Sequence, residues 1–251
     1  MFLGIEKGPI LMSALKPLGR SAKDFGETAY KLALGGCPLI KDDHSLFNQS
    51  YAPFKDRVKA CVDSVNNANA KTGGRSLYIA NCTADSMEFL ERAMTAQELG
   101  AGGIMAAPGL LGLSIIRELS SAPDFHLPIF LHPCFSGPLV LSADSGVSPF
   151  CYYGQFSRLA GADAAIFTSF GGRFPFTEEV CRKICDGTET EMGGLRSIFP
   201  VPSGGMKWQL FKKMVQVYGP DAIFLVGGAL LTESDDLTAN MHFYFEKLNE
   251  A

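Results

Sequence analysis

Short and almost continuously apolar runs recur along the chain, and their regular spacing restricts the possible folds more than any other feature. The runs are residues 10–15, 38–41, 76–82, 102–108, 128–133, 164–170, 196–202 and 222–228. They return about every thirty residues, which is the length of one strand–helix unit. Strands that are covered on both faces show such runs, because neither face meets water. The pattern predicts eight parallel strands.

Helical periodicity appears between the apolar runs. Apolar residues repeat at i, i+3, i+4 and i+7 over 58–65 and 211–218, and a last stripe covers 237–248. Ser21 followed by Asp24 is typical of a helix start. Eight strand–helix units without a dividing linker predict one domain over residues 1–251, a (β/α)8 TIM barrel in the α/β class. An open, doubly wound sheet of eight parallel strands is the alternative.

Composition excludes several classes of function. The net charge of −4 leaves no basic footprint for nucleic acid. No apolar stretch reaches the ~18 residues that cross a membrane, and no signal peptide is recognised at the first residues. The seven cysteines contain no CxxC pair, so we expect free thiols in a reducing, cytoplasmic compartment. Cys181 and Cys185 lie four residues apart on an expected helix, which is a weak metal signal.

The second apolar run ends in a cluster of titratable side chains, Lys41, Asp42, Asp43 and His44. Residues two apart on a strand point to the same side, so Lys41 and Asp43 should face the barrel mouth and Asp42 should face outward. His44 can join them if the strand bends. A carboxylate and an imidazole suit a divalent metal, and oxygen donors favour Mg²⁺. An ordinary Lys–Asp ion pair beside a solvated histidine is the alternative interpretation.

Other polar residues follow the remaining strands at the same end, where barrel enzymes build their sites. Lys16 follows the first strand and is either a general base or phosphate contact, or a surface lysine. His132 ends the fifth strand and is either a proton donor or substrate contact, or a structural group. Asn81 ends the third strand, and Arg173 follows the sixth.

Glycines follow the last two strands. Ser203, Gly204 and Gly205 come after the seventh, and Gly227 and Gly228 after the eighth. Barrels commonly bind phosphate between these two loops, because glycine lets backbone N–H groups approach the oxygens. The glycines could instead only shape turns.

Five segments together resemble the catalytic barrel of the RuBisCO large-chain superfamily, and the resemblance covers nearly the whole chain. They are ALKPLGRSAKDFG (14–26), GGCPLIKDDH (35–44), TGGRSLYIANCT (72–83), PVPSGG (200–205) and FLVGG (224–228).

The resemblance implies a role for each matching residue. Lys41 would become a carbamate and hold Mg²⁺ with Asp43 and His44. Lys16 would be the enolisation base, and His132 would lie in the substrate site. The glycine loops at 204–205 and 227–228 would hold the substrate phosphate.

Several positions depart from the carboxylase pattern. His44 stands where a glutamate is usual, and Pro133 where carboxylases place an arginine for the second phosphate. Phe167 is expected to replace a histidine at the end of the sixth strand. Residues 171–176 offer no match to the mobile lysine of the carboxylase loop. The chain therefore resembles a RuBisCO-like protein of the non-carboxylating kind, often called form IV.

The expected activity is a Mg²⁺-dependent enolisation of a phosphorylated ketose or 3-oxo sugar acid phosphate, as an isomerase or as a decarboxylating lyase, without CO2 fixation. Lys16, Lys41 and His132 would be catalytic, Asn81 and Arg173 would contact substrate, and we expect a homodimer. The alternatives are a true ribulose-bisphosphate carboxylase and a catalytically silent barrel that serves a partner chain. The chain starts at the first barrel strand, so we expect the N-terminal domain of the family to be absent.

Overall fold

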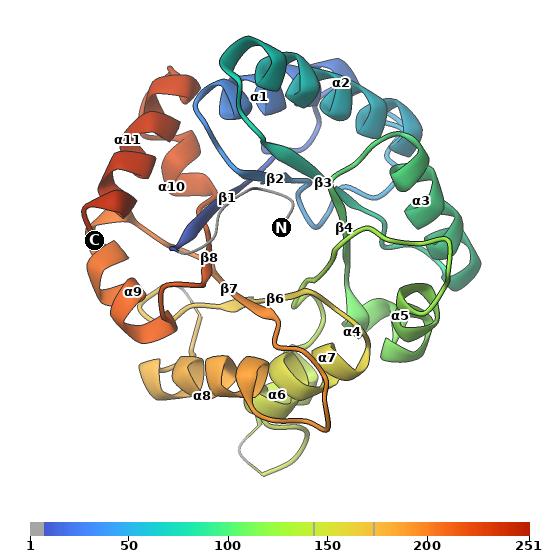
Figure 1. Cartoon of the computed structure of the whole chain (residues 1–251), viewed down its shortest axis with the longest axis vertical. Helices are drawn as coiled ribbons and strands as arrows, with labels where there is room; N and C mark the ends of the chain where they lie inside the picture. The colour runs from blue at the N-terminus through green and yellow to red at the C-terminus, as the bar shows by residue number, and fades with distance from the viewer. Residues whose placement is uncertain (1–7, 143, 173) are drawn as a thin grey trace.

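A computed structural model describes residues 8–142, 144–172 and 174–251 of the chain. The described residues form eight strands that pair in parallel, each with the next, and β8 closes the ring against β1 (Figure 1). The strands are β1 (Ile10–Ala14), β2 (Leu39–Lys41), β3 (Leu77–Asn81), β4 (Gly103–Ala106), β5 (Ile129–Leu131), β6 (Ala164–Thr168), β7 (Phe199–Ser203) and β8 (Ile223–Leu225). The predicted (β/α)8 barrel is confirmed, and the open sheet is not formed.

Helices surround the strands as an outer ring (Figure 1). The longer ones are α1 (Ala22–Leu34), α2 (Phe54–Thr72), α3 (Ser86–Glu98), α5 (Leu113–Ser120), α8 (Glu178–Glu189), α9 (Phe211–Tyr218) and α11 (Leu237–Asn249). Short helical turns are α4 (Pro108–Leu111), α6 (Gly137–Val140), the π-helical η1 (Phe150–Phe156), α7 (Ser157–Leu159), the 3₁₀ turn η2 (Trp208–Leu210) and α10 (Gly228–Leu231). The predicted stripes at 58–65, 211–218 and 237–248 lie on α2, α9 and α11.

The start of α1 follows from its sequence. The Ser21 side chain accepts the N–H of Asp24, and the Asp24 carboxylate accepts the N–H of Ser21. This reciprocal capping box satisfies two backbone donors that the first turn of a helix leaves unpaired.

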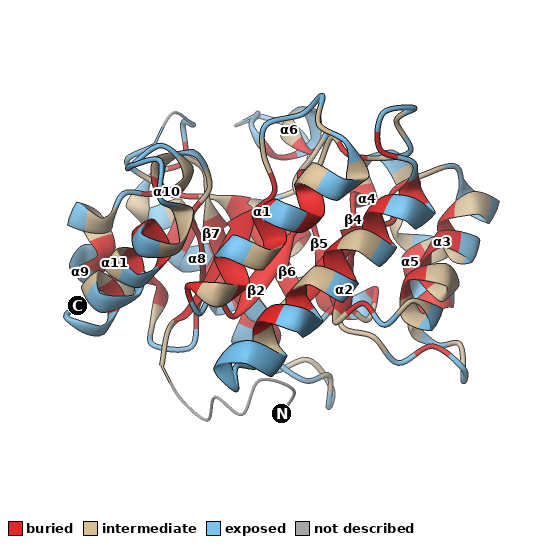
Figure 2. Ribbon diagram, turned by 90° about the horizontal axis from the view of Figure 1, so that it is seen from above, coloured by how far each residue is buried: buried red, intermediate tan, exposed pale blue. Residues whose placement is uncertain are grey.

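The core has two layers, because successive strand residues point to opposite sides of the sheet. Inside the barrel, side chains such as Met12, Leu39 and Ile166 form one cluster. A larger cluster fills the space between strands and helices, where the inner helix faces are buried and the outer faces are exposed (Figure 2). Since Leu39 points inward, the side chains of Lys41 and Asp43, two and four residues later, should follow it toward the barrel axis.

The seventh strand begins later than the apolar run that predicted it. The run covers 196–202, whereas β7 spans Phe199–Ser203. At the start of the run, the buried guanidinium of Arg158 donates to the carbonyl oxygens of Arg196 at 3.0 Å and of the preceding Leu195 at 2.7 Å, and the N–H of Ile198 donates to Thr188. These carbonyls are therefore bonded to a side chain instead of joining the strand ladder.

The sequence predicted neither a membrane-spanning segment nor a disulfide framework. Among the described residues no helix combines the length and the apolar character needed to cross a bilayer. The cysteines are free thiols, and Cys181 and Cys185 are both buried on α8.

Candidate active site

A cavity of about 590 Å³ opens at the carboxyl ends of the barrel strands. Ten of the residues singled out in the sequence line it: Lys16, Lys41, Asp43, His44, His132, Ser203, Gly204, Gly205, Gly227 and Gly228. They lie at the carboxyl ends of five different strands or in the connections that follow them, far apart in the sequence. The fold therefore brings them to one place, as the barrel prediction requires. Arg173 lies outside the described residues.

Lys41 ends β2 as a fully buried amine. Its Nζ donates to the carbonyl oxygen of Asp42 at 2.8 Å. Burial lowers the pKa of Lys41 to about 8, although the carboxylates of Asp43 and Asp42 oppose that shift. A neutral amine can react with CO2 to form a carbamate, so burial favours the chemistry that was predicted for this lysine.

Asp43 is a buried carboxylate with partners on both oxygens. Its Oδ2 lies 2.7 Å from Nζ of Lys16, and its Oδ1 accepts the N–H of Ser45 at 2.9 Å. The Nδ1 atom of His44 lies 3.5 Å from the same Oδ1. Burial alone would raise the pKa of Asp43, but the Lys16 and Ser45 hydrogen bonds and the nearby His44 hold it below its usual value. Asp43 is therefore an anion that faces the cavity.

His44 and His132 meet across the barrel mouth. Their rings stack with centroids 4.5 Å apart and planes inclined by 11°. Burial lowers the pKa of His132 well below its usual value, and the nearby Lys41, His44 and Lys16 act in the same direction. Its Nδ1 accepts the N–H of Cys134 at 3.1 Å, so the neutral ring carries its proton on Nε2. His132 can thus donate a hydrogen bond without being charged.

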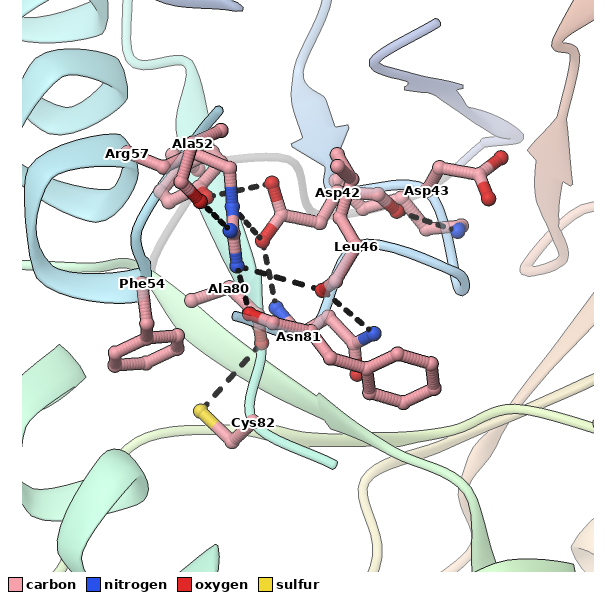
Figure 3. Close-up of polar contacts among 12 residues, drawn as sticks. Asp42, Asp43, Leu46, Ala52, Phe54, Arg57, Ala80, Asn81 and Cys82 are labelled. Carbon is pink, nitrogen blue, oxygen red and sulfur yellow. Dashed lines mark hydrogen bonds and ion pairs between the residues drawn. The ribbon is translucent and has the colours of Figure 1, made fainter. Parts of the chain in front are cut away.

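Asp42 points to the opposite side of β2, as predicted, and Figure 3 shows its carboxylate turned toward Arg57. The Nε atom of Arg57 lies 3.2 Å from Oδ2 of Asp42, and both side chains are fully buried. The Tyr78 hydroxyl donates to Oδ1 at 2.7 Å, and the N–H of Asn81 donates to Oδ2 at 3.0 Å. This network fixes the end of β2 from the outside.

Arg57 also holds the loop that follows β2. Besides Asp42, its guanidinium donates to the carbonyl oxygens of Leu46 and Ala52, which Figure 3 labels, and to that of Phe47. This role of Arg57 was not predicted from the sequence, although Arg57 lies three residues after Phe54 and four before Cys61, on the apolar face of the helix. Such a residue is almost never fully buried unless it is paired.

Asn81 has a different setting from the one its strand-end position suggested. Its side-chain amide donates to the carbonyl oxygens of His44 at 3.0 Å and Leu46 at 3.1 Å, and its Oδ1 accepts the N–H of Thr83. It does not belong to the described lining of the cavity. Asn81 therefore acts on the site through the loop that carries His44, and direct contact with substrate stays a prediction.

Phe167, which was expected to replace a histidine at the end of the sixth strand, does not face the cavity. Ile166 points into the barrel, so Phe167 must point out, and it is fully buried between strands and helices against Tyr153 and Tyr218. Thr168 lines the cavity at this strand end. Adjacent strand residues point to opposite sides of the sheet, so Thr168 faces the cavity and Phe167 faces the helices.

The glycine loops after β7 and β8 border the cavity beside Lys16. Gly204 and Gly205 have φ angles of +86° and +87°, which side chains other than glycine rarely adopt. A Cβ on Gly228 would meet no atom within 4 Å, and one on Gly227 would lie 4.0 Å from Cε of Lys16. The absence of side chains at Gly227 and Gly228 leaves room for a ligand to approach the backbone, whereas a Cβ on Gly204 would lie 2.9 Å from the ring of Phe174.

The connections after β5 and β6 give the cavity an apolar wall. This wall consists of Pro133, Val140, Leu141, Tyr153, Phe174, Pro175 and Phe176. Tyr153 shares a hydrogen bond of 2.7 Å with Ser136, so its hydroxyl is already satisfied. Pro133 offers neither a cationic side chain nor an N–H group. The described part of this wall therefore contains no cation for a second phosphate.

The donor set at the end of β2 fits a divalent metal only in part. Among the described residues, histidine, cysteine, aspartate and glutamate alone form no group of three that could hold a metal ion. Asp43 and His44 supply two neighbouring donors. A carbamate on Lys41 would add the oxygen donor that completes a set of three, and oxygen-rich sets suit Mg²⁺.

Comparison with known proteins gives consistent matches. Residues 1–240 match the family described as ribulose bisphosphate carboxylase large chain, catalytic domain. The chain is 36% identical over 230 residues to a 5-methylthioribulose-1-phosphate isomerase from Rhodospirillum rubrum. The matched region covers 90% of this chain and 59% of that protein. The chain is 34% identical over 229 residues to a 2,3-diketo-5-methylthiopentyl-1-phosphate enolase from Geobacillus thermodenitrificans, which covers 91% and 55%.

A solved structure agrees with these matches. A RuBisCO-like protein from Alicyclobacillus acidocaldarius superposes with a TM-score of 0.91 at 30% identity, covering 98% of this chain and 62% of that one. The chain therefore spans between 55% and 62% of the length of these three proteins.

The buried network behind β2 predicts a large loss of stability when Arg57 is removed. Arg57→Ala leaves Asp42 buried without its cation, which should lower the free energy of unfolding by about 3–5 kcal/mol. Lys55→Ala, at an exposed position of the same helix, is the control and should change it by less than about 0.5 kcal/mol. Chemical denaturation measures both, and equal stability of the two variants would contradict the assignment.

Proposed function

The chain belongs to the ribulose bisphosphate carboxylase large-chain family, in its RuBisCO-like branch, and we propose from this that it enolises a phosphorylated keto compound with Mg²⁺ and does not fix CO2. The observation that carries the proposal is the convergence of Lys16, Asp43 and His132 on one cavity beside the buried Lys41. A base, an anionic metal ligand and a neutral hydrogen-bond donor are the groups that proton removal next to a carbonyl requires.

Each residue has a part in the proposed reaction. Lys41 as a carbamate, Asp43 and His44 would hold Mg²⁺, which when bound supplies positive charge for the negative charge that develops on two adjacent substrate oxygens. Lys16 moves the proton to and from the substrate carbon. His132 donates the hydrogen on its Nε2 to a substrate oxygen and so helps to stabilise the same charge.

The glycine loops and the apolar wall suggest the shape of the substrate. The backbone at 204–205 and 227–228 would bind one phosphate, and Ser203 orients the first loop by donating to the carbonyl oxygen of Phe167 at 2.9 Å. The far end would lie against the apolar wall and carry no second phosphate. Two relatives are named for substrates with a methylthio group and a single phosphate. Such substrates carry a charged group at one end and an apolar group at the other.

These features favour an isomerase or enolase over the alternatives. A decarboxylating lyase would need a carboxylate on the substrate, and the described part of the apolar wall offers no cation for it. The same wall weakens the case for a ribulose-bisphosphate carboxylase. A silent barrel would have no need for a buried lysine next to a buried aspartate. A homodimer and a cytoplasmic location remain parts of the proposal.

The reaction can be tested by deuterium exchange. Incubated in D2O with Mg²⁺, bicarbonate and 5-methylthioribulose 1-phosphate, the protein should exchange a substrate proton next to the carbonyl, which NMR detects. Lys16→Ala should slow exchange by about 100-fold or more, since general bases typically contribute 10²–10⁴. Lys23→Ala, an exposed lysine on α1, is the matched control and should not.

Three outcomes would contradict the proposal. Labelled CO2 incorporated with ribulose bisphosphate would establish carboxylation. Exchange at the wild-type rate in Lys16→Ala would place the base elsewhere. No exchange with any phosphorylated ketose, when the Rhodospirillum rubrum relative exchanges in the same buffer, would favour a silent barrel.

The proposed phosphate position predicts the effect of a side chain at Gly228. Gly228→Val extends into space that is empty within 4 Å of the added Cβ, so the melting temperature should hold while inorganic phosphate binds about tenfold more weakly, since hydrogen bonds to charged groups are worth ~1.5–3 kcal/mol. Gly137→Ala, at the opposite wall of the same cavity, is the control and should leave phosphate affinity unchanged. Calorimetry measures both, and unchanged affinity in Gly228→Val would rule the position out.

A further inference from the structure

Lys16 occupies the oxygen atom of Asp43 that a metal ion would need. Its Nζ lies 2.7 Å from Oδ2. The other oxygen, Oδ1, is held by the N–H of Ser45 at 2.9 Å and lies 3.5 Å from Nδ1 of His44. The backbone of the loop after β2 thus binds Oδ1, whereas Oδ2 is reached by a side chain from another strand. A cation entering from the cavity would meet Lys16 at Oδ2.

The environment of Asp43 explains why a cation is held there. Its side chain is only 5% exposed, and a buried carboxylate is costly unless it is paired. Lys41 does not provide the pairing hydrogen bond, because its Nζ donates to the carbonyl oxygen of Asp42. Lys16 supplies it from the connection after β1, with a side chain that is itself 41% exposed and can turn without disturbing the core.

We propose that Lys16 is a placeholder cation, which neutralises Asp43 until Mg²⁺ binds and is displaced by the metal toward the substrate. A divalent ion and an ammonium group repel each other, so each weakens the binding of the other to one carboxylate oxygen. The placeholder role rests on the proposed metal role of Asp43, and the use of the displaced Lys16 as a base rests in addition on the proposed reaction.

The cavity offers a second position for the displaced side chain. The Lys16 stem runs beside the loop after β8, where a Cβ on Gly227 would lie 4.0 Å from Cε of Lys16. Because Gly227 lacks that atom, the lysine can turn toward the glycine loops, where an anionic ligand would pair with it. Metal binding and the release of the base for catalysis are then one event.

Magnesium affinity without substrate tests the proposal. In bicarbonate buffer, Lys16→Met should bind Mg²⁺ about fivefold or more tightly than the wild type, since one unit charge at ~4 Å is worth about 1 kcal/mol even in water. Lys16→Arg keeps a cation at Oδ2 and should bind no tighter than the wild type. Lys23→Met makes the same change in net charge at a side chain that is 85% exposed, and should leave the affinity unchanged. Isothermal titration calorimetry measures each constant.

The opposite result is equally clear. Affinity in Lys16→Met that equals or falls below the wild-type value would overturn the placeholder role, and Lys16→Gln serves for the same comparison if Lys16→Met does not fold. If the wild type exchanges deuterium and binds Mg²⁺ but the substitution leaves affinity unchanged, only this inference fails. If the wild type, Lys16→Met and Lys16→Arg all bind no Mg²⁺, the proposed metal site fails together with the placeholder role.

Discussion

The buried ion pair between Asp42 and Arg57 is the interaction on which the site depends. Both side chains are fully buried, and the guanidinium also binds three carbonyl oxygens of the segment 46–52. A pair of this kind contributes little net stability, but its loss leaves a buried charge without a partner. Its value here is geometric, because it fixes the end of β2 from outside and so sets where the neighbouring residues on the inner side point.

Because successive residues point to opposite sides, residues 41–44 at the end of β2 have different roles. Asp42 binds the helix layer, whereas Lys41 and Asp43 face the cavity, and Asn81 holds the loop that carries His44. The connections that follow the strands give the cavity three different borders. Those after β1 and β2 are charged, those after β7 and β8 are rich in glycine, and those after β5 and β6 are largely apolar. A molecule with a phosphate at one end and an apolar group at the other matches this order.

Much of this arrangement could be predicted from the sequence. Eight apolar runs specify the barrel, and period-two alternation specifies that Lys41 and Asp43 point inward while Asp42 points outward. Long-range contacts were not predictable in the same way. The partner of Asp42 is fifteen residues away on a helix. The pairing of Lys16 with Asp43 joins the connections after β1 and β2, and it depends on the register between these strands, which cannot be read from the sequence. The outward direction of Phe167 was not predicted either, because it depends on where β6 ends relative to its neighbours.

The central claim is that the two adjacent aspartates have separate duties, Asp42 in the fold and Asp43 in cation binding. Thermal unfolding of Asp42→Asn and Asp43→Asn, with and without Mg²⁺ in bicarbonate buffer, tests it most directly. Asp42→Asn should melt well below the wild type yet keep the upward shift that Mg²⁺ causes by binding the folded state. Asp43→Asn should fold and lose that shift. A full Mg²⁺-induced shift in Asp43→Asn would contradict the account.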